Sequence, residues 1–152
     1  MQLRITDRES GTGSDSLVFV ISGHGLHVTL GGVTWSATSN LLVSGVALDR
    51  FVFLVPKELE IAGVESSGLE AWELADAPDG THTSITLSYR QPFLGARPIQ
   101  FRGVMATPPL LPWRVPNLIL EKAVSHVGKA IVQAPGDIRA VPQLESGVRR
   151  HQ

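Results

Sequence analysis

Two histidines next to flexible glycines form one of the candidate chemical patterns in this chain of 152 residues. His24 and His27 lie in the pentapeptide GHGLH, and an H-x-x-H spacing on a helix can begin a metal site. The glycines disfavour a helix, and residues three apart on a strand point to opposite faces. A zinc site also needs three or four ligands. The remaining ligands would have to be distant residues such as His82, His126 or Asp49. We therefore expect both histidines to lie in turns or at the surface with ordinary hydrogen-bond partners, and we expect no metal site.

Two carboxylates and several serines are the other candidates for catalysis. Glu58 and Glu60 have the i, i+2 spacing of side chains on one strand face. Glycoside hydrolysis needs carboxyl groups on both sides of a cleft, so we interpret this pair as the solvated face of a strand buried through Leu59 and Ile61. The G-x-S-x-G turn that holds the nucleophile of serine hydrolases does not occur. The phosphate-binding motifs G-x-x-x-x-G-K-[ST] and G-x-G-x-x-G are absent as well. The sequence predicts no catalytic residue and no cofactor, and hence no enzyme.

The aromatic residues suggest a different function. Exposed flat aromatics can stack on sugars, but Trp35 and Trp72 lie in or beside apolar runs, where packing in the core explains them. Trp113 lies in a proline-rich stretch beside Arg114. These two residues, Trp113 and Arg114, are therefore the candidate ligand-binding residues, and a carbohydrate-binding module is the first alternative function.

Short apolar runs separated by turns make up most of the chain. Phe51 to Leu74 shows this best, since Pro56, Gly63 and the SSG triplet divide it into runs too short for a globular helix. Gly31-Gly32 predicts a tight hairpin, and SGHG at 22–25 predicts a break between strands. Short strands at intervals of about 8 to 16 residues favour a sandwich or barrel. The expected runs are 17–21, 26–30, 33–37, 41–48, 50–55, 59–64, 69–74, 82–89 and 97–106.

The C-terminal part is more ambiguous. Residues 107–116, TPPLLPWRVP, contain four prolines and predict an extended crossing segment. Residues 117–132 fit one amphipathic helix capped by Asn117, and they also fit two strands with a turn at Lys122-Ala123. Gly128 inside a helix would cost about 1 kcal/mol relative to Ala. That cost and the all-β context favour strands, with one helix near 117–132 as the alternative.

Composition limits the classes of partner. A hydrophobic content of 43%, a charged content of 18% and a net charge of −1 describe a folded domain without the basic field that nucleic acid requires. Cysteine is absent, which excludes disulfides and thiol chemistry. No run of 18 apolar residues could form a transmembrane helix. We expect a flexible entry at 1–16, a β-sandwich domain at 17–142 and a frayed tail at 143–152.

The order of these runs resembles β-sandwich modules of large exported bacterial proteins, through 43–55, 59–64, 69–74, 85–89, 99–105 and 124–132. The first half also resembles the N-terminal β-domain of zinc aminopeptidases, in which an L-x-I-x-x-V strand follows a break, here Leu59-x-Ile61-x-x-Val64. The peptidase signature H-E-x-x-H is absent. The resemblance therefore implies a non-catalytic domain and transfers no functional residue.

The expected fold is an all-β sandwich of about nine or ten mostly antiparallel strands. The expected function is that of a non-catalytic module that binds another protein or a neighbouring domain of its own chain, as part of a larger exported bacterial protein. An excised domain would favour an extracytoplasmic location, and a free-standing chain a cytoplasmic one. The alternatives are the carbohydrate-binding module and a small metal-dependent hydrolase that uses His24, His27 and one carboxylate.

Overall fold

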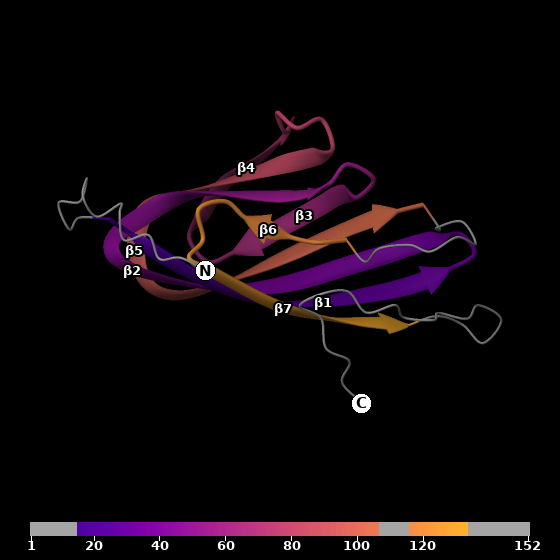
Figure 1. Cartoon of the computed structure of the whole chain (residues 1–152), viewed down its shortest axis with the longest axis horizontal. Coiled ribbons are helices and arrows are strands. Elements are labelled where there is room, and N and C mark those ends of the chain that lie inside the picture. Colours follow the sequence, from indigo (N-terminus) through magenta and orange to yellow (C-terminus); the bar gives the residue numbers. More distant parts are fainter. Residues whose placement is uncertain (1–14, 107–115, 134–152) are drawn as a thin grey trace.

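The computed structural model describes residues 15–106 and 116–133, and these residues form strands and turns without a helix. Figure 1 shows the arrangement of the strands, all of which belong to one hydrogen-bonded sheet. The strands are β1 (Leu17–Thr29), β2 (Gly32–Pro56), β3 (Glu60–Ser66), β4 (Leu69–Asp76), β5 (His82–Met105), β6 (Ile119–Leu120) and β7 (Ser125–Gln133). The prediction of an all-β fold is confirmed. This part of the chain contains no helix able to cross a membrane.

The single sheet folds back on itself because two strands are long enough to run through both layers of a sandwich. β2 and β5 have 25 and 24 residues and pair antiparallel along almost their whole length. Their register shifts between Val43 and Arg50, and glycines with positive φ, Gly45 and Gly95, lie beside this irregularity. Bulges of this kind bend strands. Figure 1 shows both strands curving back at the left end of the molecule.

Each layer contains one half of each long strand. The first layer has the order β7-β1-β2-β5-β3, and the second is built by β6, β2, β5 and β4. All pairs are antiparallel except β1 with β7. The described residues therefore form seven strands and not nine or ten, because β2 and β5 each join runs that the sequence suggested were separate.

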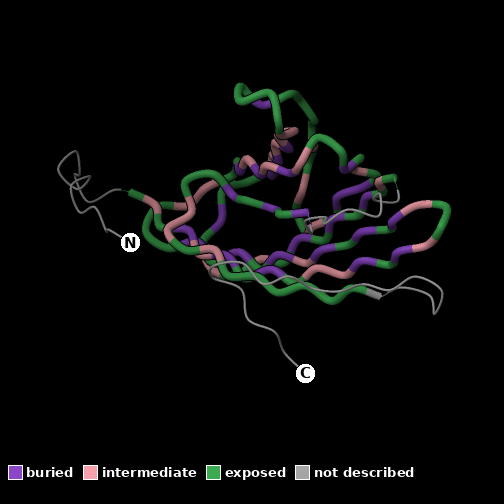
Figure 2. The backbone as a smooth tube through the Cα atoms, turned by 45° about the vertical axis from the view of Figure 1, so that its right-hand side comes forward, coloured by how far each residue is buried: buried purple, intermediate pink, exposed green. Residues whose placement is uncertain are grey.

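The core lies between the two layers. Inward side chains alternate with outward ones along the strands, which appears in Figure 2 as alternating colours along the tube. Phe53 from the second layer meets Phe101 from the first in an edge-to-face contact, with ring centroids 5.0 Å apart. Trp35 packs beside Phe101 and is completely buried. This contact across the layers identifies the fold as a sandwich with one core.

The predicted break at 22–25 is wrong, because β1 runs without interruption from Leu17 to Thr29. Hydrogen bonding from both sides explains this continuity, since β2 and β7 both pair with this segment. Gly23 and Gly25 lie on the outer face, and the polar side chains of Ser22 and His24 point inward to partners within the protein. Satisfied polar groups allow the strand to pass through an otherwise turn-like sequence.

The strand interpretation of residues 117–132 is confirmed. β6 pairs with β2, a turn follows in which Lys122 has a φ of 65°, and β7 then runs parallel to β1. The turn lies at Glu121-Lys122, one residue earlier than predicted. The predicted flexible entry, the proline-rich crossing and the frayed tail fall largely or wholly outside the described residues.

Candidate functional site

The two residues predicted to bind a ligand, Trp113 and Arg114, lie outside the described residues. The other large aromatics are structural. Trp35 is in the core, Trp72 packs half-buried against it, and Tyr89 is buried with its hydroxyl donating to Ser66 Oγ at 2.8 Å. Core packing of Trp35 and Trp72 is confirmed, and neither ring belongs to an exposed stacking platform.

His24 and His27 lie on opposite faces of β1. His24 points inward, where its Nδ1 accepts a hydrogen bond of 3.3 Å from the indole of Trp35, and His27 is exposed on the outer face. The two imidazoles therefore do not converge on one ion. Within 15–106 and 116–133 no group of three or more His, Asp or Glu side chains is placed to hold a metal. This arrangement gives no support to the metal-dependent hydrolase.

His24 belongs instead to an inward-facing polar cluster at the boundary between β1 and β7. Ser22 Oγ lies 2.8 Å from Ser39 Oγ and 3.0 Å from His126 Nε2. Burial lowers the pKa of His24, with the charge of His126 as the second cause, and burial also lowers the pKa of His126. Both rings are therefore held in the neutral form to lower pH than an ordinary histidine, and the cluster joins β7 to β1.

The carboxylates Glu58 and Glu60 are exposed, as expected, but they do not share a strand. Glu58 lies in the turn after β2, and Glu60 is the first residue of β3. Leu59 between them is buried, and Ile61 is half-buried. The predicted strand face is thus shorter than the sequence suggested, because the turn after Pro56 continues through Glu58.

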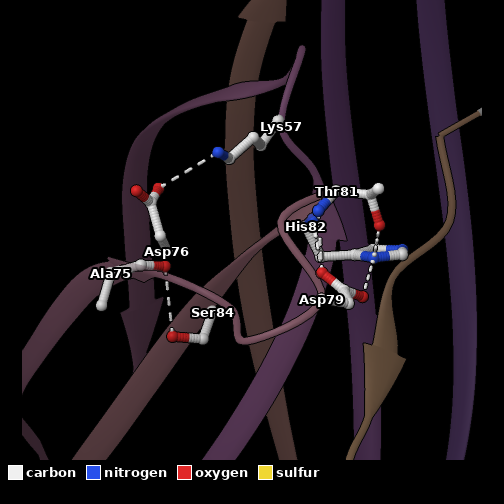
Figure 3. A network of polar contacts seen from close by, with 7 residues as sticks. All are labelled: Lys57, Ala75, Asp76, Asp79, Thr81, His82 and Ser84. Carbon is white, nitrogen blue, oxygen red and sulfur yellow. Dashed lines mark hydrogen bonds and ion pairs between the residues drawn. The ribbon is translucent and has the colours of Figure 1, made fainter.

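An aspartate, a histidine and a threonine meet in the turn between β4 and β5, as Figure 3 shows. Asp79 Oδ2 and Thr81 Oγ1 lie 2.7 and 2.9 Å from the same ring nitrogen of His82, Nδ1. A catalytic triad places the carboxylate and the hydroxyl on different ring nitrogens. Asp79 Oδ1 also accepts from the backbone N–H groups of Thr81 and His82. These bonds, Thr81 N–H first, lower the pKa of Asp79, and the group fixes the turn.

The outer surface of the first layer carries the exposed apolar side chains that form the candidate site. Ile21 and Val127 are register partners on β1 and β7 and are 64% and 59% exposed. Phe19, two residues before Ile21 on β1, pairs with Leu42 of β2. We call this surface the β1–β7 face, defined by Leu17, Phe19, Ile21, Leu42, Val127 and Ile131.

The β1–β7 face is almost free of charge. Outward residues of the first half of β2 are uncharged, as are those of β1 apart from the titratable His27, and Lys129 is the charged residue on the outer side of β7. Gly23 and Gly25 leave the middle of β1 flat. Interfaces between proteins are depleted of charge at their centres. The composition of this face is therefore that of an interaction surface.

The β1–β7 face also ends at an open sheet edge. Among the described strands, β7 pairs with β1 alone and is the last strand in its layer (Figure 1). Natural proteins usually protect such edges with charges, prolines or bulges. In β7 the described part offers one such device, Lys129, between Val127 and Ile131. An edge protected by a single charge beside an apolar face favours contact with another polypeptide.

No protein-family model matches the chain, and a comparison with curated proteins finds no match. Solved structures do resemble it. An M1 zinc metallopeptidase from Deinococcus radiodurans is 15% identical, with a TM-score of 0.44, over 64% of this chain and 23% of its own. A non-cellulosomal cohesin from the archaeon Archaeoglobus fulgidus is 10% identical, with a TM-score of 0.44, over 76% of this chain and 91% of the cohesin.

A type I cohesin from Clostridium thermocellum, solved in complex with a dockerin, is 9% identical over 80% of this chain and 97% of its own, with a TM-score of 0.44. The resemblances to zinc aminopeptidases and to β-sandwich modules are thus confirmed as likenesses of fold. The chain spans less than a quarter of the metallopeptidase. At these identities and TM-scores, function has to be argued from the residues of the chain itself.

Proposed function

We propose that this chain is a non-catalytic β-sandwich module that binds a protein partner through the β1–β7 face. The observation that carries the proposal is the pairing of Ile21 with Val127, two exposed β-branched side chains side by side on a surface almost free of charge. Burying exposed apolar area contributes roughly 25 cal/mol per Å². An exposed apolar patch rimmed by polar residues is typical of an interaction site.

The partner that suits this face is a neighbouring domain within a larger exported bacterial protein. A surface with such exposed isoleucine and valine side chains favours permanent contact, because long-lived interfaces are more apolar than transient ones. A covalently linked domain would keep the face covered at all protein concentrations. A separate protein that docks on the same face is the other form of this function.

Hydrogen exchange tests the proposal. The chain is measured alone and within the longest polypeptide that its natural reading frame encodes, or with a separate partner copurified at defined stoichiometry. We expect slower amide exchange in β1 and β7 in the larger assembly. The variant Ile21→Glu/Val127→Glu should lose this protection, because two carboxylates would be desolvated at the contact.

Leu30→Glu is the matched control. Leu30 is more exposed than Ile21 or Val127, but it lies at the tip of the β1–β2 hairpin, about 30 Å along β1 from Ile21. This variant should retain the protection. Equal exchange rates in β1 and β7 in the isolated and assembled chains would overturn the proposal.

A further inference from the structure

A concave site, separate from the β1–β7 face, lies between the β3–β4 turn and the bend of β5. Its volume is about 310 Å³, and its lining includes Ser67 and Gly68 of the turn together with Arg90, Gln91, Phe93 and Arg97 of β5. No aspartate or glutamate lines this cavity. Arg90 and Arg97 are both lining residues, and two positive charges at one concave site favour an anionic ligand.

Arg97 is held in a fixed orientation. Its guanidinium carbon lies 4.1 Å from the centroid of the Phe93 ring and 5.4 Å from that of Tyr89. Its Nη1 donates a hydrogen bond of 2.8 Å to the carbonyl oxygen of Ser67. Arginine carries five N–H donors, so the edge formed by Nε and Nη2 remains for a ligand. A donor pair that is already oriented loses less entropy on binding.

The backbone around Arg97 is adapted to this arrangement. The N–H of Arg90 donates to the carbonyl of Gly68 at 3.0 Å, which fixes the turn against β5. Gly68 has a φ of +80°, and a Cβ atom there would lie 2.9 Å from Nη1 of Arg97. The turn therefore requires glycine for its conformation, and a side chain there would displace the guanidinium of Arg97.

Neither arginine has an acidic partner in the described part of the chain. The ion pairs there join Lys57 with Asp76, His82 with Asp79, and Arg102 with Glu65. The stacking and the Ser67 hydrogen bond explain the position of Arg97, but they do not explain Arg90 or the absence of a carboxylate. An arginine pair in a cavity that lacks its own carboxylate is suited to one supplied by a ligand.

We propose that the Arg90–Arg97 cavity binds a carboxylate, with Arg97 as the bidentate donor and Arg90 as the second cation. The flat Nε–Nη2 edge matches two coplanar oxygens. Arginine also binds phosphate in this way, so inorganic phosphate is the competing anion in the test below. The carboxylate can belong to a small organic acid or to an acidic side chain of a peptide. This site is independent of the β1–β7 face.

Titration followed by NMR tests this proposal on the intact chain. The ligands are glutarate, a Glu-Glu dipeptide blocked at both ends, and inorganic phosphate, all at a constant ionic strength of about 0.15 M. We expect saturable shifts of the Gly68, Arg90 and Gln91 amides and of the Arg97 Nε–H signal, with a dissociation constant on the order of 1 mM or lower. Tighter binding of glutarate identifies a small acid, and tighter binding of the dipeptide identifies an acidic peptide.

Three variants separate the site from general charge effects. Arg90→Gln should weaken carboxylate binding about tenfold, and Arg97→Lys at least as much, because lysine lacks the planar fork. Arg102→Gln removes the same charge on the outer face of β5, where Arg102 pairs with Glu65, and should leave affinity unchanged. Because Arg90 holds the turn through its backbone N–H, which the substitution keeps, its variant remains informative if Arg97→Lys unfolds. Tighter binding of phosphate, or equal affinity in Arg90→Gln, would overturn the proposal.

Discussion

The indole Nε1 of Trp35 donates a hydrogen bond of 3.3 Å to Nδ1 of His24 across the β1–β2 pair. Trp35 is completely buried, and the two ring centroids are 5.9 Å apart. Because Nδ1 accepts, the neutral imidazole carries its proton on Nε2. Protonation of His24 would add a hydrogen to Nδ1, facing the indole N–H. A charge on this ring therefore breaks the hydrogen bond.

We predict that the protein loses stability as the pH falls below about 6.5, the ordinary histidine pKa. The folded pKa values of His24 and His126 both lie below that value, so the unfolded chain binds more protons in this window. The stabilisation is complete above the unfolded pKa and is lost as the pH falls through the folded values. Urea unfolding at about pH 7.5 and about pH 5.5 measures the difference.

The double variant His24→Asn/His126→Gln should show a flatter pH dependence. These amides place hydrogen-bonding atoms near the positions of His24 Nδ1 and His126 Nε2 without titrating. His27→Gln, on the outer face of β1, is the control and should keep the wild-type slope. The lowered pKa of Asp79 affects stability only near and below pH 3.8, the ordinary pKa of this carboxyl group, and therefore outside this window. A double variant with an unchanged slope would contradict the assignment to these two rings.

A second prediction concerns two glycines in the first layer, one on β5 and one on β1. A Cβ on Gly103 of β5 would lie 2.8 Å from the carbonyl oxygen of Glu60 and 3.2 Å from both Leu59 Cδ1 and Trp35 Cε3. Gly103→Ala should therefore lower the free energy of unfolding by about 1–3 kcal/mol. A Cβ on Gly23 meets nothing within 4 Å, so Gly23→Ala should change it by less than about 0.5 kcal/mol. Equal effects in urea unfolding would refute the packing argument.

The contact between the layers gives a third prediction. Phe53 and Phe101 are both completely buried, one in each layer. Phe53→Ala and Phe101→Ala should each cost about 3–5 kcal/mol of stability through lost burial and a cavity. Phe53→Leu and Phe101→Leu give a milder double-mutant cycle, whose coupling energy should be about 0.5–1.5 kcal/mol. Strictly additive losses would mean that the edge-to-face contact adds nothing beyond burial.

The sequence allowed the all-β class and most strand positions to be predicted, because alternation of apolar and polar residues is a local signal. Ile85, Leu87 and Tyr89 are buried as their period of two indicates. The length of β1 and β2 could not be predicted in the same way. SGHG at 22–25 contains turn-forming residues, and only the pairing of β1 with both β2 and β7 makes it a strand.

The candidate sites depend on contacts between residues distant in sequence, which no local pattern contains. Ile21 and Val127 are separated by about a hundred residues, and their proximity follows from the parallel pairing of β1 with β7. Arg97 meets Ser67 only because β5 pairs with both β3 and β4, the strands that the turn connects. That Arg97 has no carboxylate partner within residues 15–106 and 116–133 is likewise visible only in three dimensions. Local analysis of chemical motifs considered GHGLH as a metal site and rejected it, but it could not show that this segment is part of a continuous strand.

The open edge of β7 gives the last prediction. Val127 and Ile131 are both exposed on a strand whose outer edge no other described strand pairs with, and such an edge can add strands from other chains. The variant Val127→Lys/Ile131→Lys should slow aggregation of the isolated chain severalfold at equal concentration, as followed by light scattering. Its free energy of unfolding should change by less than about 1 kcal/mol, because both side chains face solvent. Lysine at the equally solvent-facing hairpin tip, Leu30→Lys, should leave aggregation unchanged. If Leu30→Lys slows aggregation as much, net charge and not the β7 edge controls it.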